Sequence, residues 1–97
     1  MKSGSELISE ERSRQITKEG WSAEHDKQHD AMTFVRAAQA YLMIDKDNIT
    51  RAGVWPWTGG FFKPKDAIKD LTRAGALIAA AIDKLFKISF MIKQQKI

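Results

Sequence analysis

The sequence predicts an all-α protein: three helices in a single domain over residues 1–97, a long tryptophan-rich loop between the second and third helices, and a long C-terminal helix. Three observations lead to this fold class. The first segment has helix start and stop signals, the second has an apolar stripe at helical spacing, and the last has a heptad-like apolar pattern. A chain of 97 residues fits one small domain with a modest core.

Residues 5–20 are predicted to form the first helix. Ser3 or Ser5 can cap it, Ser3 has capping-box spacing to Glu6, and Gly20 is a natural stop. Apolar residues are few here. The helix therefore needs specific polar contacts as well, from Arg12, Arg14 or Gln15.

The second helix is expected to begin near Asp30, which can cap the segment DAMTFVRAAQAYLMI. Its apolar residues share one stripe, with Val35 beside it. The stripe consists of Phe34, Ala38, Tyr41 and Leu42. Several alanines in the same segment allow another helix to approach closely.

An irregular stretch, residues 45–64, follows, broken by Pro56 and the Gly59–Gly60 pair. Its aromatic content argues against disorder. Trp55 and Trp57 flank the proline, so their rings are not expected to enter one core easily. They form either a small core that covers the loop or an aromatic platform for a planar ligand or a partner surface.

The last helix is predicted from Pro64 to about Gln95, a length of roughly 45 Å. One apolar seam has alternating spacings of three and four residues: Ile68, Leu71, Gly75, Ile78, Ile82 and Leu85. A second, adjacent stripe consists of Ala74, Leu77 and Ala81. Two stripes require contact with more than one neighbour. We expect a backbone or a bulky ring, such as that of Trp21 or Tyr41, to pack against Gly75.

This helix is longer than the domain, whose expected radius of gyration is about 13 Å. Its end stays apolar, which predicts a homo-oligomer with an interface that includes Leu85, Ile88 and Ile92.

The segment EGWSAEHDKQHD, residues 19–30, concentrates polar side chains. His25 and His29 are four residues apart, as in the zinc motif HExxH, with Asp26 where that motif has glutamate. No third ligand stands out, so we predict no metal site and no cofactor. The histidines instead cap helix ends, bond the backbone around Trp21, or face a ligand or a partner.

Basic residues near the aromatic ones can hold anionic groups, and the start of the last helix, KPKD, offers backbone amides unless Asp66 occupies that position. The candidate binding residues are Arg12, Arg14, Trp21, His25, Asp26, His29, Trp55, Trp57, Lys63 and Lys65. An alternative is a magnesium site of a nucleotide pyrophosphohydrolase, built from Glu10, Glu11, Asp66 and Asp70.

The composition limits the classes of partner and the compartment that we expect for this chain. The net charge of +4 comes from four lysines after Asp83, which suit a helix end, so a nucleic-acid partner is not expected. Cysteine is absent, no apolar run approaches the roughly 20 residues of a membrane span, and the polar start MKSGSELISEERSR predicts no signal peptide. These features favour the cytoplasm.

The motifs ERSRQITKEGWSAEHDKQHD, AAQAYL, WPW and FKPKDAIKDLTRAGALIAAAIDKL, in this order, resemble a group of short proteins of phages and prophages. The resemblance covers roughly residues 10–85. That group has no established biochemical activity. The chain departs from it at AMTFVRAAQAYL, where an acidic start is common, and at Ala81, where glutamate often stands. A helix followed by GW and HD is also similar to ryanodine-receptor-type repeats.

The resemblance implies a phage accessory protein in the host cell cytoplasm, with counter-defence as one candidate role. Such a protein would act without catalysis, by binding a host protein or a small anionic ligand such as a nucleotide. The alternative is the metal-dependent pyrophosphohydrolase.

Overall fold

The computed structural model describes residues 1–18, 31–57 and 62–95 of the chain. These residues form helices α1 (Gly4–Lys18), α2 (Ala31–Leu42), α3 (Asn48–Val54) and α4 (Ala67–Gln95), and no strand occurs among them. The predicted all-α fold with a long C-terminal helix is confirmed.

Local capping explains where the helices begin. The Glu6 N–H donates to Ser3 Oγ over 3.2 Å, which confirms the predicted cap of α1. Asp47 caps α3 by accepting from the Thr50 N–H at 2.7 Å, so the stretch expected to be irregular contains a short helix. Asp66 accepts from the Lys69 N–H at 2.9 Å, and α4 therefore begins after Asp66 and not at Pro64.

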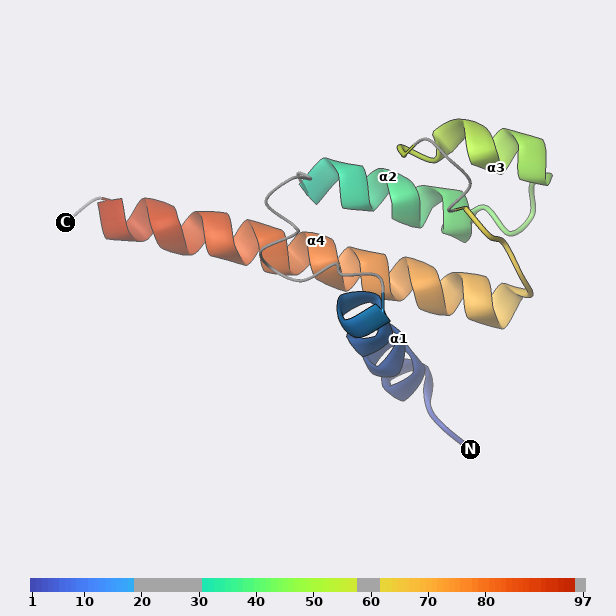
Figure 1. Ribbon diagram of the computed structural model, residues 1–97, viewed down its shortest axis with the longest axis horizontal. Coiled ribbons are helices and arrows are strands. Elements are labelled where there is room, and N and C mark those ends of the chain that lie inside the picture. Colours follow the sequence, from blue (N-terminus) through green and yellow to red (C-terminus); the bar gives the residue numbers. More distant parts are fainter. Residues whose placement is uncertain (19–30, 58–61, 96–97) are drawn as a thin grey trace.

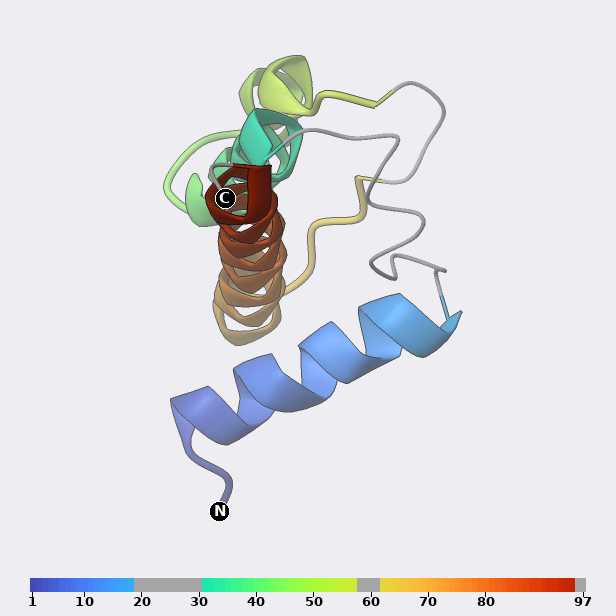
Figure 2. The ribbon, with the colours of Figure 1, turned by 90° about the vertical axis from the view of Figure 1, so that its left-hand side faces the viewer.

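The other helices lie on two sides of α4 and leave its C-terminal part uncovered. In Figure 1, α2 lies along α4 in the opposite direction, α3 lies beyond α2, and α4 continues past the start of α2. Figure 2 shows α1 crossing α4 on the side away from α2. At 29 residues, α4 is about 44 Å long, compared with a radius of gyration of 14.3 Å for the chain.

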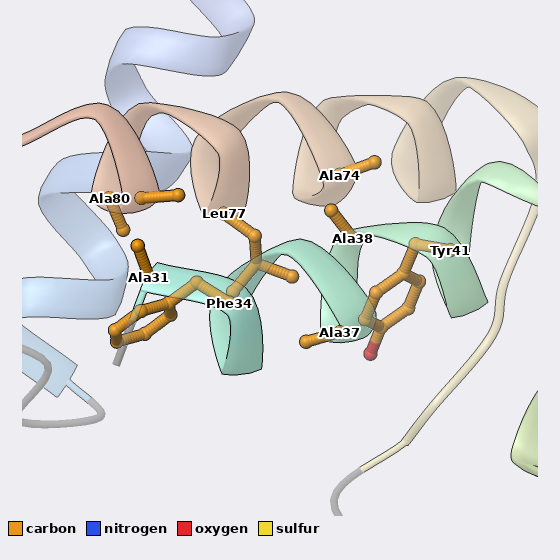
Figure 3. Close-up of a cluster of buried hydrophobic side chains, with 9 residues drawn as sticks. Ala31, Phe34, Ala37, Ala38, Tyr41, Ala74, Leu77 and Ala80 are labelled. Atoms are coloured by element: carbon orange, nitrogen blue, oxygen red, sulfur yellow. The ribbon is translucent and has the colours of Figure 1, made fainter. Parts of the chain in front are cut away.

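The core lies between α2 and α4 (Figure 3). Phe34 and Leu77 are its largest fully buried apolar side chains, and most of the surrounding contacts come from alanines. The buried cluster consists of Ala31, Phe34, Ala37, Ala38, Tyr41, Ala74, Leu77, Ala80 and Ala81. The stripe of Ala74, Leu77 and Ala81 therefore faces α2, as its spacing permits. Alanines on both helices let the two backbones approach closely.

The contact between α1 and α4 is centred on Gly75. A β-carbon built on Gly75 would lie 2.6 Å from Cδ1 and 2.8 Å from Cγ1 of Ile8. The expected close contact is confirmed, but its partner is the aliphatic side chain of Ile8 and not the ring of Tyr41; Trp21 lies outside the described residues. Glycine fits here because a β-carbon would come too close to Ile8, so a larger side chain would require Ile8 or α1 to move.

Candidate functional site

The aromatic residues of the loop pack as a small core. The Trp55 and Trp57 rings meet edge to face with centroids 5.0 Å apart, and Trp57 meets Phe34 in the same way at 5.9 Å. Trp55 also contacts Tyr41 at 5.6 Å and Phe62 at 5.4 Å. The expectation that both tryptophans could not turn into one core is wrong, because edge-to-face stacking lets both rings pack against the α2–α4 cluster. Both rings remain half-buried.

A buried ion pair, which the sequence did not reveal, fastens α3 to the rest of the fold. Arg51 donates to Asp70 Oδ2 at 2.9 Å, and both side chains are almost fully buried. The same guanidinium donates to the carbonyls of Ala40 at 2.9 Å and Tyr41 at 3.2 Å, at the end of α2, where a helix leaves carbonyls without intrahelical partners. It also lies 5.5 Å from the centre of the Phe62 ring. The role of Arg51 is therefore structural.

The start of α4 is occupied by the chain's own carboxylates. Asp66 accepts from the Lys69 N–H, and Asp70 accepts from the Lys65 N–H at 2.7 Å. The Lys63 N–H donates to Tyr41 Oη at 3.2 Å. Of the two readings of KPKD, the one in which Asp66 takes the anion position is confirmed. Lys63 and Lys65 are exposed residues.

The candidate arginines of α1 also have partners within the chain. Arg14 holds Glu11 through two bonds of 2.7 Å, and Gln15, which is 2% exposed, donates to Glu11 at 3.2 Å. Arg12 lies 3.9 Å from Asp83 of α4. The Arg12–Asp83 pair joins α1 to α4, as the thin apolar content of α1 led us to expect, whereas the Arg14 and Gln15 bonds lie within α1.

The environment of Glu11 shifts its titration. Burial raises the pKa of the Glu11 carboxyl. The hydrogen bonds and charge of Arg14, the hydrogen bond from Gln15 and the charge of Arg73 together lower it by more, so the pKa lies below the ordinary value of 4.5. Glu11 is therefore ionised at neutral pH. It stabilises the arginine beside it and is poorly suited to act as a general acid.

The acids of the hydrolase alternative are dispersed among structural contacts. Glu10 pairs with Lys2 at 2.8 Å, Glu11 is held by Arg14, Asp66 caps α4, and Asp70 is buried beside Arg51. Within residues 1–18, 31–57 and 62–95, no three histidine or acidic side chains come together in a way that could hold a metal ion. Trp21, His25, Asp26 and His29 lie outside the described residues.

An apolar ridge on α4 stays exposed in the described part of the chain. It comprises most of the predicted heptad seam together with Phe86, and these side chains are between 40% and 71% exposed. We define the α4 ridge as Ile68, Leu71, Ile78, Ile82, Leu85 and Phe86. Large apolar side chains gathered on one helix face mark a surface for contact with another protein.

None of the described helices is both long enough and apolar enough to cross a bilayer. Comparison of the chain with protein-family models, with curated proteins and with solved structures gives no significant match in any of the three.

Proposed function

We propose that this chain is a non-enzymatic accessory protein of the phage type that binds a host protein through the α4 ridge in the host cytoplasm. The observation that carries the proposal is the exposure of the ridge: large aliphatic side chains point away from the core although alanines of the same helix fill it. The resemblance to short phage proteins supports the setting.

A protein partner is favoured over a small anionic ligand. Arg14 is held by Glu11, Arg12 lies beside Asp83, and the amides of Lys65 and Lys69 around the start of α4 donate to carboxylates of the chain. An anion would have to displace these internal partners. An apolar helix face needs no such exchange, and an amphipathic helix of a partner can cover it directly.

Self-association through the end of α4, which the sequence predicts at Leu85, Ile88 and Ile92, belongs to the same proposal. Leu85 is 54% exposed in the single chain. A second copy can use the C-terminal part of the ridge, which leaves Ile68 and Leu71 at the start of α4 for a host protein.

The test measures how much of a host protein the tagged chain captures from lysate, compared among the wild type, Ile68→Asp and Ile49→Asp. Ile68→Asp places a charge on the ridge, and Ile49→Asp makes the same change at an isoleucine of α3 that is 87% exposed. We expect the wild type and Ile49→Asp to retain one stoichiometric partner and Ile68→Asp to lose it, while circular dichroism shows equal helix content. Equal capture by all three forms would contradict the assignment of the ridge.

A further inference from the structure

The C-terminal half of α4 extends beyond the helices that cover its first half. α2 begins at Ala31, and Figure 3 shows Ala31 beside Ala80 of α4. From Ile82 to Gln95, α4 runs on past this point for roughly 21 Å (Figure 1). Within this length the structure describes side chains as far as Lys87, and Leu85 and Phe86 are exposed.

The exposed area is large for a single helix. Ile78, Ile82, Leu85 and Phe86 are 40%, 47%, 54% and 71% exposed. With side-chain areas on the order of 150–200 Å² each, these fractions leave roughly 320–420 Å² of apolar surface in water. A stable interface buries about 800 Å² on each partner. This patch supplies about half of that area, and residues 88–95 extend the same helix with further apolar residues in the sequence.

We infer that this half of the α4 ridge pairs with the same half of a second copy, in antiparallel orientation, with Ile82 of each copy level with Leu85 of the other. The inference rests on the proposed function in one respect only, that the ridge is a binding surface. The spacing of Ile78, Ile82 and Leu85 continues through Ser89 to Ile92 in steps of four and three. Such a repeat forms the seam of a helix pair, so the face is complementary to itself.

The charge of the tail selects the orientation. After Asp83 the chain carries four lysines and no acid. In a parallel pair, each lysine would lie beside its counterpart at a helix separation of about 8–10 Å. In the antiparallel pair, the two copies of Lys84 stay nearly level, each beside Asp83 of the other copy, but the two copies of Lys87 are shifted by about 10 Å along the axis and the two copies of Lys93 by about 28 Å. Both shifts reach or exceed the screening length of about 8 Å at physiological salt.

The arrangement of α1 and α2 selects the same orientation. α1 crosses α4 at Gly75 and α2 covers it as far as Ala81, so the first half of α4 has a helix on either side. A parallel pair would bring both copies of α1 and α2 to the same level. In the antiparallel pair, the projecting end of each α4 lies beside the covered half of the other, where Ile8 lies against Gly75 but Leu71 and Ile78 on either side of it stay exposed.

The mass of the purified protein tests the pairing. We expect light scattering at about 100 µM to give twice the 11.0 kDa of the single chain. Ile82→Asp and, separately, Phe86→Glu should give the single-chain mass with unchanged helix content, whereas Ile49→Asp should remain a dimer. A single-chain mass of the wild type at every concentration overturns the pairing and leaves capture of a host protein through Ile68 untouched, because no host protein is present.

Cysteine cross-linking tests the orientation, since the chain has no cysteine of its own. In the antiparallel pair, position 78 lies level with position 89 of the other copy, whereas the two copies of position 78 are about 16 Å apart along the axis. A disulfide needs α-carbons within about 7 Å. A mixture of Ile78→Cys and Ser89→Cys chains should therefore form the mixed disulfide dimer, and Ile78→Cys alone should not cross-link. Efficient cross-linking of Ile78→Cys to itself overturns the antiparallel orientation.

Discussion

Substitution of Gly75 measures how closely α1 is packed against α4. The β-carbon of an alanine at this position would lie 2.6 Å from Cδ1 and 2.8 Å from Cγ1 of Ile8. Favourable carbon–carbon contacts are about 3.5–4.0 Å, so alanine is about 1 Å too close. Cδ1 is the end of a flexible, half-buried side chain and can rotate away, but relief at Cγ1 requires a change of rotamer or a shift of α1.

Two effects of opposite sign set the magnitude. A mid-helix glycine costs about 1 kcal/mol relative to alanine, which favours the substitution. A side chain forced off its rotamer costs about 0.5–1.5 kcal/mol, and overpacking that moves a helix costs about 1–3 kcal/mol. We expect Gly75→Ala to be close to neutral or slightly destabilising. Gly75→Leu adds three more carbons at the same contact and should destabilise by about 1–3 kcal/mol.

Urea denaturation followed by far-UV circular dichroism is the assay. The matched control is Gly53→Ala in α3, where a β-carbon meets nothing within 4 Å, so the free energy of unfolding should rise by up to about 1 kcal/mol. In an Ile8→Ala background the obstacle is removed, and Gly75→Ala should then stabilise by about the same amount. If Gly75→Leu raised the melting temperature, or if Gly75→Ala had the same effect in both backgrounds, the Ile8 contact would not restrict this site.

Three further predictions concern the stability contributed by buried or half-buried groups. Arg51→Met removes one charge of the buried pair and Asp70→Asn neutralises the other, and each should lower the free energy of unfolding in urea by about 3–5 kcal/mol, because the remaining buried charge has lost its counter-charge. Phe34→Ala leaves a cavity at a fully buried ring and should cost about 3–5 kcal/mol in the same assay. Because the pKa of Glu11 is depressed, its stabilising contribution is present above its ordinary value of 4.5 and is lost as the pH falls below that value. Denaturation at pH values from about 7 to about 3 should therefore show a larger acid loss for the wild type than for Glu11→Gln, and parallel curves would contradict the Arg14 contact.

The periodic parts of the fold could be predicted from the sequence. Helical spacing places Phe34, Ala38, Tyr41 and Leu42 on one stripe of α2, and the first three are buried, whereas Leu42, at the end of the helix, is 44% exposed. The capping box of Ser3 and Glu6 is a local signal that needs no tertiary contact. The tryptophan-rich loop was correctly placed, although its short helix α3 was missed.

The orientation of α4 could not be predicted in the same way. Its two stripes are both apolar, and the larger side chains belong to the seam that includes Ile78 and Ile82. The structure buries the alanine-containing stripe, in which Leu77 is flanked by alanines that let the two helices approach closely. Which stripe is buried depends on how the side chains of α2 and α4 fit together. The spacing of apolar residues within either helix alone does not reveal it.

In the candidate site, too, contacts between residues far apart in the sequence could not be predicted. Arg51 and Asp70 are 19 residues apart, and no motif joins them. The arginines of α1 were correctly expected to make specific contacts, but their partners were visible only in part: the Glu11–Gln15 spacing was local, whereas Asp83 comes from another helix.

The way α1 is attached has a consequence for hydrogen exchange. α1 packs chiefly on α4, through contacts that include Ile8 against Gly75 and the Arg12–Asp83 pair, whereas α2 and the facing half of α4 share the buried cluster. Opening of α1 therefore disrupts little of that cluster. Its amides should exchange with solvent through local opening, at rates insensitive to low concentrations of denaturant, while amides around Phe34 and Leu77 should exchange only when the whole chain unfolds. The first helix and the rest of the molecule would thus form two cooperative units of unequal stability within 97 residues.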